Sequence, residues 1–259
     1  MKNTILEAKN LCKSFANEGT QVHVLNNVDL KIYEGDFTII MGASGSGKST
    51  LLYNISGMDK PSEGEVIFDN TDITKLSEKK LAGLRAFSFG FVFQQIHLVN
   101  NLTLIENTLV PGYMDKDKTK QQVKERADKL FDMMSLTEAK DRLPSQVSGG
   151  EAQRAAMSRA VINKPKLLFA DEPTGALNRI NTENVLHLLT ELNKDGQSIL
   201  MVTHDIKAAL RANRLLYLED GKICGEMELK PFYELDKADK TALKDREAQV
   251  NSWLSSMNW

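Results

Sequence analysis

The feature that most constrains this chain is a glycine-rich loop between two apolar runs, at residues 37–41 and 51–55. This order predicts a strand, a tight loop and a helix. Glycine lets the backbone curl closely around an anion, and the N–H groups at the start of a helix point toward it. The loop therefore predicts a phosphate-binding site. A plain glycine turn would not need the lysine and serine that follow it. The loop consists of Gly42, Ala43, Ser44, Gly45, Ser46, Gly47, Lys48, Ser49 and Thr50.

The loop matches the pattern G-x-x-x-x-G-K-[ST] in full. In this pattern the lysine is a point charge for the β- and γ-phosphates, and the hydroxyl that follows it binds Mg²⁺. We therefore expect a nucleoside triphosphate at residues 42–50, with Lys48 on its phosphates and Ser49 as a metal ligand.

Length and charge narrow the function classes. The chain has 259 residues, which fits one α/β cassette with subdomains. Its 33 basic and 35 acidic residues give a formal charge of −2, so no basic excess favours a nucleic-acid partner. No apolar run approaches the ~20 residues that a bilayer crossing needs, and the N-terminus lacks the apolar core of a signal peptide. We expect a cytosolic chain in which Cys12 and Cys224 are free thiols.

The N-terminal part has strand patterns at residues 5–8, 22–25, 28–32 and 64–70, separated by turn residues. They predict an antiparallel patch beside the nucleotide. Phe15 could stack on an adenine ring, although its spacing alone favours a core aromatic residue.

The middle of the chain begins with an aromatic strand, residues 87–93, that runs into Gln94. The carboxyl ends of strands in an α/β sheet face the ligand crevice, so Gln94 could reach Mg²⁺ or a water. A polar loop residue would explain it equally well. Residues 103–143 are mostly helical in pattern and predict a compact helical subdomain, with an apolar stripe formed by Val123, Ala127, Leu130, Phe131 and Met134.

A helix start follows at Ser148, where Ser148 and Glu151 fit a capping box. Such a box is usually only a cap. However, Gly149 and Gly150 come directly after it, and glycine costs ~1 kcal/mol in a helix relative to alanine. Close approach of a ligand would explain both glycines.

Two further apolar strands end in groups that can do chemistry. Residues 166–170 lead into Asp171 and Glu172, and residues 198–203 lead into His204. With a phosphate loop upstream, we expect Asp171 to hold Mg²⁺ through water and Glu172 to orient and deprotonate the attacking water. His204 would hydrogen-bond the γ-phosphate or that water. A strand end can also be acidic merely because it meets solvent.

The C-terminal tail has a different pattern. Leu243, Val250, Leu254 and Met257 fall on one helical face, and both tryptophans of the chain, Trp253 and Trp259, lie here. The tail is predicted to be a helix, packed either against its own cassette or against a partner subunit.

Taken together, these residues resemble the ATP-binding cassette ATPases. Residues 42–49 are similar to the Walker A motif, 167–171 to Walker B and 148–151 to the signature. Gln94 resembles the Q-loop, His204 the switch histidine and Phe15 the aromatic A-loop. Residues 72–78, 91–95 and 170–177 resemble the branch that serves lipoprotein release, macrolide export and antimicrobial-peptide resistance. One departure is Asn178, where the D-loop usually has Asp.

The resemblance implies a P-loop fold with a mainly parallel sheet, an antiparallel β subdomain and a helical subdomain at about residues 96–160. The cassette would span residues 1–230, followed by a helical tail at 231–259. It also implies a head-to-tail dimer, in which Ser148 and the Gly149 and Gly150 amides bind the γ-phosphate of the other chain's ATP. Glu151, the last residue of the signature, belongs to the same nucleotide-binding segment.

By the same resemblance, the chain would hydrolyse ATP with Mg²⁺ and power a membrane permease from the cytoplasmic face of the membrane. The expected role is resistance to, or export of, antimicrobial peptides. Lipoprotein release is one alternative, and a regulatory clamp that signals through a permease-like protein to cell-wall enzymes is another.

Overall fold

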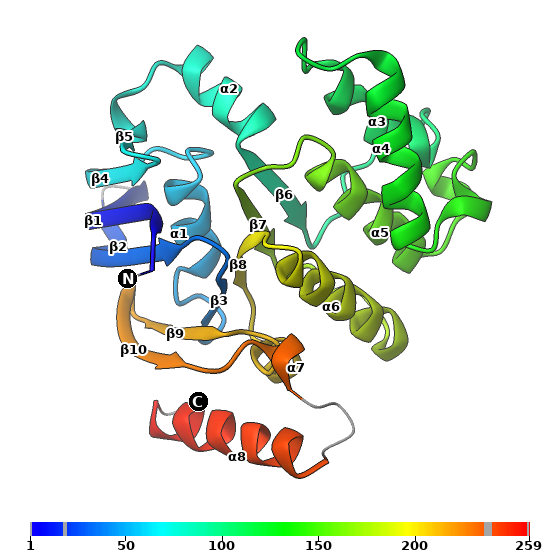
Figure 1. Ribbon diagram of the computed structural model, residues 1–259. Helices are drawn as coiled ribbons and strands as arrows, with labels where there is room; N and C mark the ends of the chain where they lie inside the picture. The colour runs from blue at the N-terminus through cyan, green and yellow to red at the C-terminus, as the bar shows by residue number, and fades with distance from the viewer. Residues whose placement is uncertain (1, 18–19, 236–239, 258) are drawn as a thin grey trace. The chain divides into compact units, whose positions relative to one another are not determined.

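The structure is a computed structural model that describes residues 2–17, 20–235, 240–257 and 259. The chain forms two compact units (Figure 1). Unit 1 contains residues 1–81 and 190–259, and unit 2 contains residues 82–189. The predicted boundaries of the helical subdomain and the tail stay predictions.

The first sheet of unit 1 is antiparallel, with strand order β2-β1-β4-β5. The short segments predicted at 22–25 and 28–32 are one continuous strand, because a bulge at Asn27, whose φ is 49°, absorbs the break in the pattern. The bounds are β1 Thr4–Asn17, β2 Thr20–Tyr33, β4 Glu63–Phe68 and β5 Thr71–Asp72, followed by the 3₁₀ helix Ile73–Lys75.

The second sheet of unit 1 is mainly parallel. Strand β3 (Phe37–Met41) pairs in parallel with β8 (Ser198–Val202) and β9 (Arg214–Glu219), and β10 (Lys222–Glu228) is antiparallel to β9. Every residue of β3 and β8 is buried, as expected for parallel strands covered on both faces. Helix α1 (Lys48–Ile55) follows β3, and the short α7 (Ile206–Ala209) follows β8.

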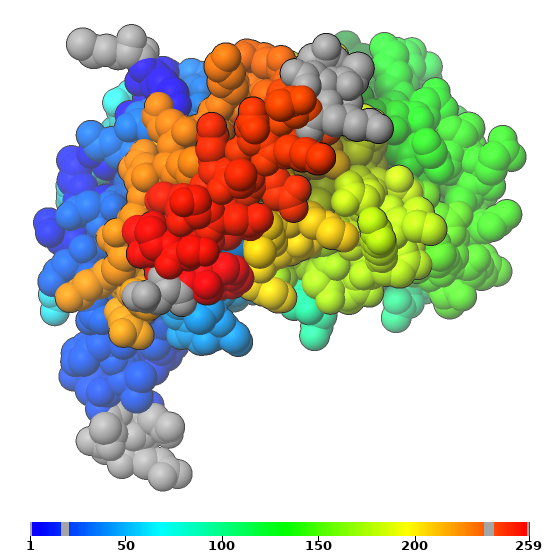
Figure 2. All heavy atoms as spheres, turned by 90° about the horizontal axis from the view of Figure 1, so that it is seen from below, coloured from blue at the N-terminus to red at the C-terminus, as the bar shows by residue number. Residues whose placement is uncertain are grey.

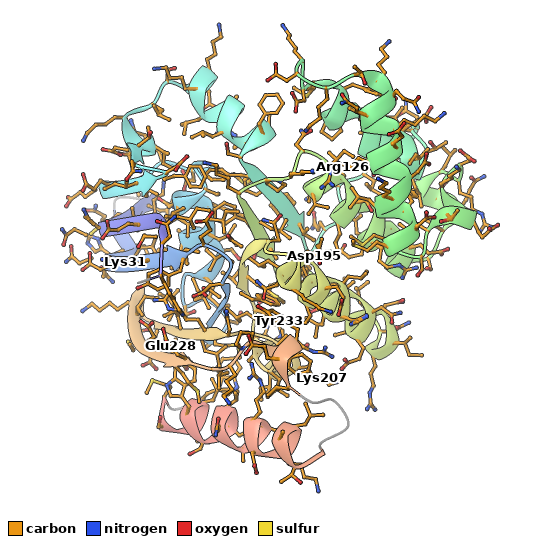
Figure 3. All side chains as sticks on the ribbon, viewed as in Figure 1. Lys31, Arg126, Asp195, Lys207, Glu228 and Tyr233 are labelled. Carbon is orange, nitrogen blue, oxygen red and sulfur yellow. The ribbon has the colours of Figure 1, made fainter. Side chains whose placement is uncertain are left out.

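Unit 2 combines two parallel strands, β6 (Phe89–Phe93) and β7 (Leu167–Asp171), with a group of helices. Phe89 and Phe91 pack against Phe169 across the pair, with ring centroids 5.1 and 5.5 Å apart. Arg126 donates from α4 to the carbonyls of Val161 and Ile162 (Figure 3). The helices are α2 Glu78–Phe87, whose first turn belongs to unit 1, α3 Leu104–Tyr113, α4 Lys120–Met133, α5 Gly149–Val161 and α6 Arg179–Lys194, whose last residues belong to unit 1. There are 3₁₀ turns at Thr137–Ala139 and Pro144–Gln146.

The tail contains the 3₁₀ turn Phe232–Glu234 and the helix α8 (Lys240–Ser256), which lies along β9 and β10 of its own unit (Figures 1 and 2). Val250 and Leu254 are buried, and the Tyr217 ring makes edge contacts with both tryptophans. Arg246 is also buried and donates to the carbonyls of residues 210, 212 and 230. Of the two predicted arrangements, the structure therefore shows packing against the same chain.

Among the described residues, no helix combines the length and the apolar character needed to span a bilayer. Cys12 and Cys224 are free thiols, as predicted.

Candidate functional site

The phosphate loop lies in unit 1 between the end of β3 and the start of α1. Gly47 precedes α1 with a φ of 101°, a left-handed conformation that glycine adopts without steric cost. In the part of the chain that the structure describes, no side chain caps this helix start. The Lys48 ammonium turns back onto the loop and donates to the carbonyls of Gly42 (2.7 Å) and Ala43 (2.8 Å). Lys48 is 7% exposed, so its charge is held inside the loop.

The three glycines at 42, 45 and 47 have different surroundings. A Cβ on Gly42 would lie 2.2 Å from the Leu218 carbonyl oxygen, and one on Gly47 would lie 3.0 Å from the Val24 carbonyl oxygen. Within 4 Å of a Cβ on Gly45 there is nothing among the described atoms. The first two glycines therefore let the loop approach both sheets of unit 1. Gly45, by contrast, borders open space in the loop.

Ser46 adds a polar atom that fits an anion. Among the described residues, its hydroxyl oxygen is buried and has no hydrogen-bond partner. A buried hydroxyl without a partner costs free energy that a ligand oxygen can recover. The loop therefore offers a lysine charge, an uncapped helix start and an orphan hydroxyl, which is the donor set that a phosphate group requires.

Phe15 lies on the β1–β2 hairpin and is 45% exposed. The interpretation as a core aromatic residue is therefore wrong, because nearly half of the residue lies outside the packed interior. The Lys13 ammonium lies over the ring, 4.9 Å from its centroid. An exposed ring on this hairpin remains available to stack on a planar ligand.

His204 follows β8, the parallel neighbour of β3. Thr203 donates its N–H to the Ile40 carbonyl at 3.2 Å, so His204 and the phosphate loop follow strands that end at the same edge of the sheet. His204 is exposed, and Asp205 directly after it accepts from the Lys207 N–H and caps α7.

Unit 2 brings Gln94, Asp171 and Glu172 to one strand edge. Phe93 pairs with Asp171 in the parallel register, so Gln94 and Glu172 each follow the end of a paired strand. The Gln94 carboxamide lies against Gly175, where a Cβ would be 2.9 Å from its Nε2 atom. The register therefore places these three residues at the ends of two neighbouring strands.

Glu172 adopts a left-handed conformation with a φ of 48°. This conformation is costly for a residue with a Cβ, by about 1–3 kcal/mol, and such strain gathers at functional sites. Asp171 before it is 8% exposed. The backbone thus turns sharply between the two carboxylates and presents them differently to their surroundings.

The signature start forms the predicted capping box. The Glu151 carboxylate accepts from the Ser148 N–H (2.9 Å) and hydroxyl (2.7 Å), and the Ser148 oxygen in turn accepts from the Glu151 N–H. Hydrogen bonds from the Ser148 side chain and backbone lower the pKa of Glu151. The carboxylate therefore stays ionised at the start of α5.

The two signature glycines have different explanations, which corrects the single explanation expected for both. A Cβ on Gly150 would lie 2.2 Å from the Asn181 Oδ1 atom, so this glycine makes room for a side chain of its own unit. Gly149 is exposed, and a Cβ there would meet nothing within 4 Å among the described residues. Only Gly149 keeps the close approach of a ligand as its explanation.

The sequence analysis did not predict two sets of hydrogen bonds near the site, those of Gln153 and of Asn178. Gln153 is 1% exposed, and its amide donates to the carbonyls of Phe93 (3.0 Å) and Pro173 (2.9 Å), which joins α5 to the segments that carry Gln94 and Glu172. An amide on the apolar face of a helix could have signalled this. Asn178 accepts from the Asn181 N–H at 3.0 Å and so caps α6, a task that Asn performs as well as Asp.

Known proteins with a similar sequence or fold identify the family of this chain. The family model for the ABC transporter matches residues 25–175. The MacB macrolide export ATP-binding/permease protein of Pasteurella multocida (strain Pm70) is 36% identical over 259 residues, and that of Wolinella succinogenes is 40% identical over 234 residues. These matches cover 100% and 88% of this chain but only 38% and 35% of the relatives, so the chain spans little more than a third of their length.

Solved structures with the same fold include MJ0796, a bacterial ABC transporter cassette. The dimeric post-hydrolysis state of MJ0796 bound to ADP and phosphate is 39% identical, with a TM-score of 0.80 over 88% of this chain and 100% of that one. The cbiO1 protein of Clostridium perfringens, part of the transporter complex cbiONQ, is 26% identical, with a TM-score of 0.79 over 100% of both chains. The chain therefore belongs to the ABC transporter family, as an ATP-binding cassette ATPase of the branch that contains MacB.

Proposed function

We propose that this chain binds ATP with Mg²⁺ and that the energy of hydrolysis drives a membrane permease. The observation that carries the proposal is the phosphate loop, where a buried lysine and an orphan serine hydroxyl adjoin the open space at Gly45. Phosphate oxygens would replace the loop carbonyls as partners of the Lys48 ammonium, and charge-assisted bonds of this kind are among the stronger ones in proteins.

In this proposal each site residue has one role. The amides of residues 42–50 and Lys48 hold the phosphates, and Phe15 stacks on the adenine. Ser49, Gln94 and Asp171 hold Mg²⁺, which would neutralise charge on the β- and γ-phosphates. Glu172 deprotonates the attacking water, and His204 hydrogen-bonds the γ-phosphate. The strained backbone at Glu172 supports its role, because strain of this kind fixes a side chain in one direction.

We further propose that two copies of the chain form a head-to-tail dimer around ATP. The exposed Gly149 and the capping box of Ser148 and Glu151 leave the start of α5 with oriented N–H groups, which favour an anion. In the dimer, this start would bind the γ-phosphate held by the other copy, together with the amide of Gly150. The dimeric form of the similar cassette MJ0796 supports this arrangement.

The permease would dock on a groove in unit 2. This groove has a volume of about 310 Å³, and its lining includes Phe93 at the end of β6, next to Gln94. Its rim carries the exposed apolar residues Val99, Val110 and Met114, together with Arg159. Apolar patches rimmed by polar groups mark interaction sites. The MacB relatives, which are ATP-binding/permease proteins, support a permease as the partner and the cytoplasmic face of the membrane as the location.

The proposed cargo class is antimicrobial peptides, by resistance or export. The names of the macrolide-export relatives support export over lipoprotein release and over a signalling clamp. Identification of the permease that co-purifies from membranes tests this. A permease with an extracellular peptide-sensing domain would support resistance, whereas a bound cell-wall hydrolase would favour the clamp.

The same experiment tests the docking groove. Val110→Asp together with Met114→Asp should abolish recovery of the permease, because two charges would be buried in an apolar contact. Met133→Asp is the matched control, since Met133 is 41% exposed but does not line the groove. Equal permease recovery with both variants would contradict the docking site.

A further inference from the structure

We propose that Lys13 is a positioning residue for the adenine base, because it holds the Phe15 ring and ties that ring to the segment that follows the phosphate-loop helix. This inference rests on the proposed function, in which Phe15 stacks on adenine. All the residues that carry it lie in unit 1.

The first step is the contact between the ammonium and the ring. Lys13 and Phe15 are two residues apart on β1, a spacing that places side chains on the same face of a strand. The Lys13 Nζ atom lies 4.9 Å from the ring centroid, within the ~6 Å over which a cation and an aromatic face attract each other. The ammonium lies over one face of the ring and Phe15 is 45% exposed, so we expect a base to stack on the opposite face.

The second step is the anchoring of the ammonium. The same Nζ atom lies 2.7 Å from the Asp59 carboxylate and donates to the Lys60 carbonyl at 2.8 Å. The Lys13 side chain is only 12% exposed, whereas that of Asp59 is 39% exposed. Two fixed oxygens and a ring face thus surround one cation. Its position is set from three directions, which a flexible surface lysine would not show.

The third step links this anchor to the phosphate loop. Met58 and Asp59 donate their N–H groups to the Tyr53 carbonyl in α1, at 2.9 and 3.0 Å. The path from α1, the helix that follows the phosphate loop, to Asp59, Lys13 and Phe15 is therefore made of short contacts.

The hairpin is also held at two further points. Ser14 donates its N–H to the Ser62 hydroxyl, and Ser62 donates its N–H to the Cys12 carbonyl. Next to the loop itself, the Val24 carbonyl lies against Gly47. The hairpin that presents Phe15 is thus fixed at both ends of the phosphate-loop helix.

The consequence is chemical as well as geometric. A positive charge over one face of an aromatic ring draws electron density toward itself, so the opposite face becomes a better stacking partner for an electron-rich purine. Lys13 would therefore raise the part of the affinity that depends on the base. It would leave the part that depends on the phosphates unchanged.

The test uses the full chain and isothermal titration with two probes, Mg-ATP and inorganic triphosphate with Mg²⁺. Lys13→Met keeps the aliphatic stem and removes the charge, and it should weaken ATP about three- to tenfold while triphosphate affinity stays the same. Lys13→Arg should restore most of the ATP affinity. Lys9→Met is the matched control, because Lys9 is a half-buried cation of the same strand whose ion-pair partners are Glu7 and Glu65.

A second variant separates this inference from the proposed function. Phe15→Leu should weaken ATP but not triphosphate, and Lys13→Met should have no further effect on ATP in that background. If Phe15→Leu leaves ATP affinity unchanged, the stacking role fails and the Lys13 role fails with it. If Phe15→Leu weakens ATP but Lys13→Met alone does not, or weakens both probes equally, only the Lys13 role is overturned.

Discussion

The two adjacent glycines at the start of α5 give a sharp test of the site, because the same mutation should have opposite effects at the two positions. Alanine is more favourable than glycine in a helix by about 1 kcal/mol. A Cβ at position 149 meets nothing within 4 Å among the described residues. Gly149→Ala should therefore stabilise the fold by up to about 1 kcal/mol, a rise in Tm of about 2–4 °C for a chain near this size.

At position 150 the same methyl group would lie 2.2 Å from the Asn181 Oδ1 atom and 2.3 Å from its Cγ atom. The carboxamide must move, and overpacking of this kind costs about 1–3 kcal/mol. After the helix-propensity gain of ~1 kcal/mol, Gly150→Ala should lie between neutral and about 2 kcal/mol destabilised. The Asn181 side chain alone thus accounts for the expected difference in stability between Gly149→Ala and Gly150→Ala.

Asn181→Ala removes that side chain and keeps the backbone N–H that Asn178 caps. In this background Gly150→Ala should become stabilising, and a double-mutant cycle from denaturant unfolding should give a coupling free energy of about 1–3 kcal/mol. A coupling near zero, or equal stabilisation by both alanines, would refute the explanation of Gly150. In an assay of ATP-dependent dimerisation, Gly149→Ala should be the more harmful of the two variants. Only this variant places its methyl group on the exposed side, where the other copy's nucleotide is proposed to lie.

The remaining predictions concern single residues. Glu172→Gln should keep ATP binding and abolish turnover; undiminished steady-state ATPase activity would reject Glu172 as the base. Lys48→Ala should weaken Mg-ATP by about 10- to 150-fold in titration, because a charge-assisted hydrogen bond contributes ~1.5–3 kcal/mol, and an unchanged Kd would disprove our reading of the loop. For Glu151, hydrogen bonds lower the folded pKa, so its carboxylate stabilises the fold above its ordinary, unfolded pKa, and this contribution is lost as pH falls through the folded value. Wild type and Glu151→Gln should accordingly differ in unfolding free energy at pH 7, and this difference should shrink as pH falls below the ordinary pKa of a glutamate. Arg246→Met should destabilise the fold by at least ~1–3 kcal/mol, since it leaves carbonyls without their donor, whereas the exposed Lys244→Met should be neutral in the same melt.

Local chemistry made much of the site predictable from sequence. The phosphate loop, the capping box at Ser148 and the strands that end at Asp171 and His204 depend on neighbouring residues, and each lies where the pattern placed it. These features need only glycine conformation, side-chain caps and apolar runs. The sequence therefore specifies them without knowledge of the tertiary fold.

Features that depend on contacts distant in sequence were not predictable. The exposure of Phe15 requires the hairpin that carries it, and the need for glycine at 150 comes from Asn181, which lies on another helix. The bonds of Gln153 reach carbonyls 60 and 20 residues away. Such pairings follow from how elements pack, which periodicity does not encode.

The buried amide of Gln153 has a mechanical consequence. Its hydrogen bonds connect the signature helix to the Phe93 carbonyl, directly before Gln94, and to the Pro173 carbonyl, directly after Glu172. A displacement of this helix would therefore be transmitted to both backbone segments. If the nucleotide of the other copy displaced the start of α5, Gln94 and Glu172 would shift with it. Binding of the other copy's nucleotide by the signature and positioning of Gln94 and Glu172 at this copy's own nucleotide would then be one conformational change.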